Sequence, residues 1–130
     1  MPTAQQPVGV FDSGVGGLSV LQALRAELPH ERFVYLADSG NAPFVAARTH
    51  TITDYLLQHH HIKALVVACN TATAAAIHEA RARHPTLPVV GVEPALKPAV
   101  AASKTKRIGV IGTRGTLTSV KFAKLLASLH

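Results

Sequence analysis

The sequence repeats one short pattern, in which a mainly apolar run is followed by a polar turn and then by a segment with helical spacing. The apolar runs cover residues 8–11, 33–37, 64–69, 88–92 and 108–112. Residues 18–28, 46–59 and 71–83 carry apolar side chains three or four positions apart, which predicts helices. The run at 64–69 has no polar interruption, and this is typical of a strand buried on both faces of a parallel sheet.

This alternation predicts an α/β fold with three layers, in which a parallel sheet is flanked by helices and joined by right-handed crossovers. Two further helices are expected over residues 93–102 and 116–129. The basic stretch 103–107 is typical of a linker, and the strand and turn predicted from residue 108 resemble those predicted from residue 8. We therefore expect one α/β domain over residues 1–103 and the start of a truncated second α/β domain over residues 104–130.

The charge balance bears on possible partners. The formal net charge is +6, yet the basic residues are scattered and have no aromatic neighbours on which bases could stack. We therefore expect no nucleic-acid partner, although a basic nucleic-acid binder stays an alternative. Because no apolar run approaches the length of a membrane span, we expect no membrane partner. The short polar N-terminus and the single cysteine favour a cytoplasmic protein with no internal disulfide.

Polar side chains follow the predicted strands, at the edge of the sheet where parallel α/β proteins bind ligands. They include acids, hydroxyls, an amide and a thiol: Asp12, Ser13, Asp38, Cys69, Asn70, Thr71, Glu93, Thr113 and Thr116. A lone cysteine at a strand end is usually a small buried apolar residue. Here Cys69 also precedes a helix, whose N-terminus favours a thiolate. The His59-His60-His61 run is more typical of a solvated helix end than of a metal site, and we expect no metal.

Four motifs in order carry a resemblance to a known family. They are Val8-Gly9-Val10-Phe11-Asp12-Ser13-Gly14-Val15-Gly16-Gly17-Leu18, Val66-Val67-Ala68-Cys69-Asn70-Thr71-Ala72-Thr73, Gly91-Val92-Glu93-Pro94 and the stretch from Ile108 to Thr116. Together they resemble the N-terminal half of glutamate racemases, within the cofactor-independent aspartate/glutamate racemase family. Racemases for aspartate or hydantoins are the near alternative, and the first motif favours glutamate.

The resemblance implies a first domain of a two-domain, pseudo-symmetric racemase that interconverts L- and D-glutamate for peptidoglycan synthesis without a cofactor. Two thiols on opposite faces of the α-carbon would transfer its proton. By resemblance Cys69 is one of them, Asp12 assists it, and Glu93 is a supporting acid that orients a histidine of the second half. Glutamate would be held by Asp12, Ser13, Asn70, Thr71, Thr113 and Thr116.

The sequence departs from the family pattern in two places. Cys69 is its only cysteine, so the second thiol and its histidine are absent from these 130 residues. The family's Pro-Tyr-Gly and the loop after it are shortened to Pro43-Phe44-Val45. The alternative is therefore a catalytically inactive racemase fragment that acts as a folded binding or interaction domain. An apolar face on residues 104–130 would favour self-association, and we expect a possible homo-oligomer.

Overall fold

The computed structural model of the chain describes residues 3–40 and 44–129. Its centre is a four-stranded parallel sheet in the order β2-β1-β3-β4. The strands are β1 (Val8–Asp12), β2 (Phe33–Ala37), β3 (Ala64–Val67) and β4 (Val89–Gly91). All four were predicted from the apolar runs, and the α/β fold class is confirmed.

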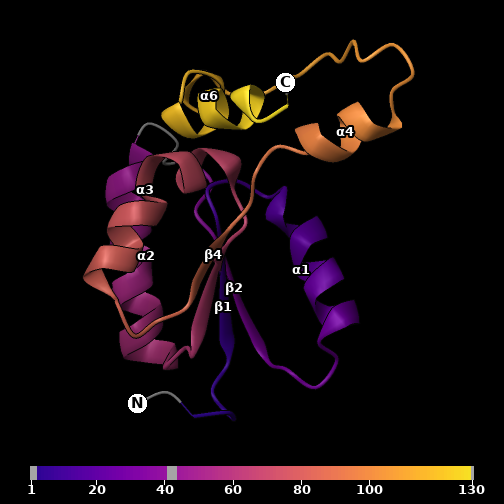
Figure 1. Cartoon of the computed structure of the whole chain (residues 1–130). Helices are drawn as coiled ribbons and strands as arrows, with labels where there is room; N and C mark the ends of the chain where they lie inside the picture. The colour runs from indigo at the N-terminus through magenta and orange to yellow at the C-terminus, as the bar shows by residue number, and fades with distance from the viewer. Residues whose placement is uncertain (1–2, 41–43, 130) are drawn as a thin grey trace.

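Helices cover both faces of the sheet and give the three layers (Figure 1). α1 (Gly17–Glu27) lies on one face, and α2 (Val45–His60) and α3 (Asn70–Arg83) lie on the other. The remaining helices, α4 (Leu96–Ala102), α5 (Arg114–Leu117) and α6 (Val120–Ala127), lie beyond the carboxyl ends of the strands.

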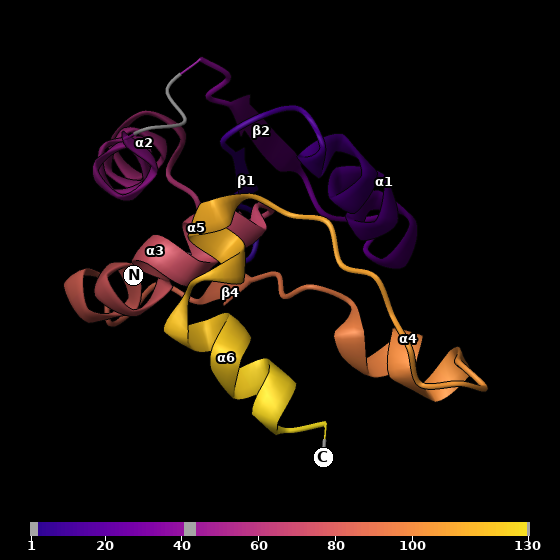
Figure 2. The ribbon, with the colours of Figure 1, turned by 90° about the horizontal axis from the view of Figure 1, so that it is seen from above.

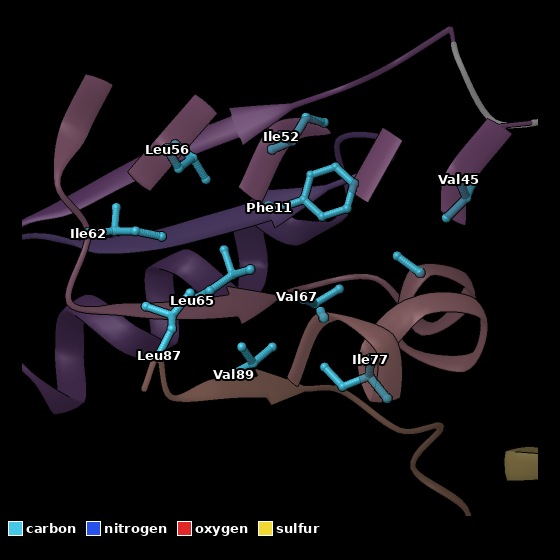
Figure 3. Packing of buried hydrophobic residues seen from close by; sticks show 12 residues of the cluster. Phe11, Val45, Ile52, Leu56, Ile62, Leu65, Val67, Ile77, Leu87 and Val89 are labelled. Atoms are coloured by element: carbon cyan, nitrogen blue, oxygen red, sulfur yellow. The ribbon is translucent and has the colours of Figure 1, made fainter. Parts of the chain in front are cut away.

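The strand alternation divides the core between the two faces, because successive side chains point to opposite sides of a sheet. Phe11, Leu65 and Val67 pack with residues of α2 and α3 in the larger cluster (Figure 3). Val10 and Val66 belong to a smaller cluster that α1 covers. Phe11, Leu56 and Leu65 are at most 1% exposed, so the aliphatic core expected from the sequence is closed on the α2 and α3 face.

The predicted fifth strand over residues 108–112 was wrong, because these residues pair with no strand among the described residues. Ile111 is fully exposed, at 103% of its reference surface, and Val110 is 37% exposed. The residue types favour a strand, but a strand exists only where a neighbour can satisfy its backbone groups. The segment instead crosses in extended form from α4 to α5 (Figure 2).

The predicted helix over residues 116–129 is also different, since it is divided into α5 and α6. Ser119 separates them, because its hydroxyl accepts a hydrogen bond from Phe122 N at 3.1 Å and begins a new helix as an N-cap. The helix predicted from residue 93 begins later, at Leu96. The shortened loop falls partly on residues 41–43, outside the described residues, and Phe44 and Val45 lead into α2. The domain boundary near residue 103 stays a prediction.

Candidate active site

Cys69 lies just beyond β3 and is the N-cap residue of α3. Its backbone is extended, and its Sγ accepts a hydrogen bond from Ala72 N at 3.3 Å. The hydroxyl of Ser13, which follows β1, lies 3.0 Å from the same sulfur. The thiol is half-buried. A sulfur at the start of a 14-residue helix, with an N–H and a hydroxyl beside it, is placed where negative charge is stabilised.

Asp12 is the last residue of β1 and is 5% exposed. Its two carboxylate oxygens accept hydrogen bonds from Gly14 N at 3.1 Å and Gly17 N at 2.5 Å, which fixes the carboxylate beneath the start of α1. Glycine is required at position 17, because a Cβ there would lie 2.8 Å from the Asp12 Cβ and 3.1 Å from the Ala68 Cβ. Each oxygen keeps a further lone pair for another donor.

Three threonine hydroxyls meet above the start of α3. Thr71 Oγ1 lies 2.7 Å from Thr113 Oγ1 and 3.1 Å from Thr116 Oγ1, and Thr113 Oγ1 donates to Thr116 Oγ1 at 3.2 Å. Thr113 is also the N-cap of α5, and Figure 2 shows α5 beside the start of α3. These contacts bring residues distant in the sequence to the edge where Cys69 lies.

Glu93 follows β4 and is exposed, in a segment without regular secondary structure. Thr73 holds the start of this segment, because its hydroxyl accepts a hydrogen bond from Val92 N at 3.1 Å and donates to Val67 O at 3.4 Å. Thr73 approaches the backbone of Gly91 so closely that a Cβ at position 91 would lie 2.5 Å from the Thr73 Cγ2. Thr73 is therefore a positioning residue for Glu93 that sequence reasoning did not assign.

These groups surround one cavity of about 550 Å³, which we call the thiol cavity. Seven of the predicted site residues line it: Asp12, Cys69, Asn70, Thr71, Glu93, Thr113 and Thr116. Ser13 does not line the cavity but contacts the Cys69 sulfur. The wall of the thiol cavity also includes Val110, Ile111 and Gly112, which were expected to form a strand. The described residues that line it include no lysine or arginine, so N–H groups and hydroxyls would hold an anion.

A second buried polar group, the hydroxyl of Tyr35 on β2, lies near Asp12 of β1. This hydroxyl has no hydrogen-bond partner of acceptable geometry within the described part of the chain. Burial raises the pKa of Tyr35 above its usual value of 10.0, and the negative charge of Asp12 raises it further. The phenol therefore stays neutral beside the carboxylate at physiological pH.

Other strand-end and histidine residues lie apart from the thiol cavity. Asp38 accepts two hydrogen bonds from Arg48, each of 2.8 Å. Hydrogen bonding with Asp38 raises the pKa of the Arg48 guanidinium. His59 lies in the last turn of α2, with its ring centroid 4.7 Å from that of Tyr55. No group of three or more His, Cys, Asp or Glu residues in the described ranges is arranged to hold a metal ion. No helix within those ranges is long and apolar enough to cross a membrane.

The arrangement suits proton transfer at a small polar ligand. A thiol and a carboxylate face the thiol cavity, and hydroxyls and an amide surround them. Cysteine and aspartate side chains can take up or release a proton at a carbon atom, and fixed donors can stabilise the charge that develops there.

Comparison with known proteins gives a consistent result. The sequence model of the Asp/Glu/Hydantoin racemase family matches residues 20–130. The glutamate racemase of Ectopseudomonas mendocina (strain ymp) is 55% identical over 97% of this chain and 50% of its own length. That of Ralstonia pickettii (strain 12J) is 56% identical over 95% of this chain and 46% of its own length. The chain thus spans about half the length of the curated relatives it matches.

Solved structures agree with the sequence comparison. The glutamate racemase of Thermus thermophilus, in complex with β-chloro-D-alanine, matches with a TM-score of 0.75 and 41% identity, over 92% of this chain and 48% of that one. The glutamate racemase of Francisella tularensis subsp. tularensis SCHU S4, in complex with D-glutamate, matches with a TM-score of 0.74 and 27% identity, over 95% of this chain and 48% of that one.

Proposed function

The chain belongs to the Asp/Glu/Hydantoin racemase family, and we propose that it supplies one face of a glutamate racemase active site, with Cys69 as the thiol that transfers the α-proton. The full reaction interconverts L- and D-glutamate and would serve peptidoglycan synthesis in the cytoplasm. The observation that carries the proposal is that Cys69 and Asp12 both line the thiol cavity, together with hydroxyl and amide donors.

The chemistry demands a competent base. The α-proton of an amino acid is weakly acidic, and without a cofactor the protein itself must stabilise the carbanion by preorganised donors. The Cys69 sulfur accepts a hydrogen bond from Ala72 N and lies at the N-terminus of α3, where the backbone N–H groups point toward it. The Ser13 hydroxyl at 3.0 Å can donate a further hydrogen bond to the thiolate.

The other site residues take roles from their positions. Asp12 is held rigidly by Gly14 N and Gly17 N, and its remaining lone pairs can accept the substrate ammonium. Asn70, Thr71, Thr113 and Thr116 line the same cavity and can donate to the substrate carboxylates. Glu93 lies at its rim as a supporting acid.

Inversion of the α-carbon requires a second proton donor on the opposite face. The 130 residues contain one cysteine, so this chain would supply one of the two thiols. A site with one thiol can remove and return a proton on the same face. We therefore propose that these residues, by themselves, exchange the α-proton of one enantiomer of glutamate.

The test is deuterium exchange. D- and L-glutamate are incubated separately with the chain in heavy water, and loss of the α-proton signal is followed by proton NMR. The proposal expects exchange of one enantiomer, abolished in Cys69→Ser and retained in Thr51→Ser, an exposed control. Absence of exchange for both enantiomers, with the chain folded, would identify the alternative, a racemase-type domain that acts only by binding.

A further inference from the structure

Tyr35, on β2, buries its polar end. Its side chain as a whole is half-buried against the core cluster that α1 covers, whereas the hydroxyl oxygen itself is buried. Tyrosine more often buries the ring and presents the hydroxyl to water. A buried donor without a partner costs free energy, so this orientation of the phenol needs a reason beyond packing.

The register of the sheet shows where the hydroxyl can reach. Tyr35 pairs with Val10 of β1, and both belong to the cluster on the α1 face. Asp12 lies two residues beyond Val10 and therefore points to that same face, about 6.6 Å further along the strand. Phe33, two residues before Tyr35, packs in the same cluster with a ring that has no hydroxyl. A phenylalanine would serve the packing at position 35 equally well, and what tyrosine adds is a hydroxyl directed toward Asp12.

The carboxylate of Asp12 has a position open for this donor. A carboxylate offers about four lone-pair positions, and Asp12 uses two of them to accept from Gly14 N and Gly17 N. Both N–H groups belong to the turn that leads into α1, whereas Tyr35 approaches from the neighbouring strand. A third donor from β2 would leave one position, on a residue that lines the thiol cavity.

The phenol and the carboxylate already influence each other. Burial raises the pKa of Tyr35 most, and the negative charge of Asp12 and hydrogen bonding with it raise it further. Among the described residues Asp12 is the only charged group that perturbs this pKa. The charge of Asp12 therefore favours the protonated phenol, which is the form that can donate.

We propose that Tyr35 is a positioning residue for Asp12, whose phenol donates a hydrogen bond to the carboxylate when glutamate binds and so directs the last lone pair at the substrate ammonium. This inference rests on the proposed function, in which Asp12 accepts that ammonium. The hydroxyl lies near the carboxylate without good alignment, so a small rotation of the Asp12 side chain completes the bond. Tyr35 does not line the thiol cavity, so it acts through Asp12 and not on the ligand.

The first test is spectroscopic and needs no turnover. The chain has two tyrosines, and the other, Tyr55, is 46% exposed on α2, so Tyr55→Phe leaves Tyr35 as the one tyrosine to observe. With ¹³C at the phenol carbon, the NMR signal of Tyr35 should move when D- or L-glutamate is added. In Asp12→Asn the phenol should ionise at lower pH, because the negative charge beside it is gone. A Tyr35 signal that responds to neither change overturns the proposal.

The second test is kinetic and follows α-proton exchange against glutamate concentration. Tyr35→Phe should raise the KM of the exchanged enantiomer at least threefold and keep kcat within twofold, because a carboxylate with one donor fewer holds the ammonium less well. Tyr55→Phe removes the same atom from an exposed ring, and it should leave both constants within twofold. Equal KM values in the two variants, or a fall in kcat alone, would refute the role of Tyr35.

A conservative replacement tests the donor itself. Incorporation of 3-fluorotyrosine into the Tyr55→Phe chain alters only Tyr35, whose phenol stays a donor, so KM should remain within twofold of the parent; a KM as high as that of Tyr35→Phe counts against the hydrogen bond. If the parent exchanges neither enantiomer, the proposed function fails, and the response of Tyr35 to Asp12→Asn then decides the contact alone.

Circular dichroism checks that each variant is folded. Should Asp12→Asn be unfolded, a nuclear Overhauser effect in the parent between the Tyr35 hydroxyl proton and the Asp12 Hβ protons takes its place. Its presence supports the contact, and its absence overturns the proposal.

Discussion

Substitution of Gly91 by alanine should destabilise the fold through one side chain, Thr73. A Cβ at position 91 would lie 2.5 Å from the Thr73 Cγ2 and 2.8 Å from its Oγ1. Thr73 is 3% exposed, and its hydroxyl is fixed between Val67 O and Val92 N, so it has no space into which to turn. Overpacking of a buried site costs about 1–3 kcal/mol, and we expect Gly91→Ala to fall in the upper half of that range.

A double-mutant cycle isolates the cause. Thr73→Ala removes both clashing atoms and leaves its own Cβ 3.2 Å from the added methyl, a distance that a small shift relieves. Alone, it loses the hydrogen bond to Val92 N and should cost about 1–2 kcal/mol. In the double variant the clash is gone, so its loss of stability should be smaller than the sum of the single losses by about 1–2 kcal/mol.

The assay is urea unfolding followed by far-ultraviolet circular dichroism, with the free energy of unfolding obtained by linear extrapolation. Gly109→Ala is the matched control, because within the described part of the chain no atom outside the adjacent residues lies within 4 Å of a Cβ at position 109. It carries the same entropic gain from replacing glycine, up to about 1 kcal/mol, without a clash. If the single losses simply add in the double variant, within about 0.5 kcal/mol, the contact with Thr73 is not what requires glycine at position 91.

Three further outcomes are expected. Ser13→Ala should slow alkylation of Cys69 by iodoacetamide at neutral pH severalfold, because the thiolate loses a donor at 3.0 Å; an unchanged rate would mean that the serine only accepts from the thiol. Because burial raises the pKa of Tyr35, the folded chain should lose stability as the pH rises above 10, where the unfolded phenol ionises first; Tyr35→Phe should remove the late phase of the absorbance titration at 295 nm and that part of the pH dependence. Gly17→Ala should cost about 1–3 kcal/mol in urea unfolding, whereas Gly16→Ala, with nothing within 4 Å, should cost less than about 1 kcal/mol; equal losses would refute the packing argument.

The central fold could be predicted because its signals are local and agree with one another. Each strand that formed is an apolar run followed in the sequence by a helix, and parallel pairing then follows from the crossovers. Residues 108–112 carry the same local signal but have no neighbouring strand in the described structure. Strand formation depends on a partner elsewhere, which residue types cannot supply.

The candidate site was predictable to the same extent. Parallel strands bring their carboxyl ends to one edge, so Asp12, Cys69 and Glu93 could be assigned together before any coordinates existed. The finer contacts could not be predicted, because they depend on differences of a few tenths of an ångström in the distances between segments far apart in the sequence. The approach of Ser13 to Cys69 is one such contact, and the hydroxyl of Thr73 at Val92 N is another.

The extended segment that completes the thiol cavity also exposes the chain to cleavage. Proteases cut where backbone is accessible and outside regular structure, and residues 103–112 meet both conditions. Lys104, Lys106 and Arg107 are exposed there, which supplies sites for trypsin directly before the wall formed by Val110 and Ile111. A ligand bound against that wall would protect these sites from trypsin. The rate of tryptic cleavage would then report how much of the thiol cavity is occupied, without any catalytic turnover.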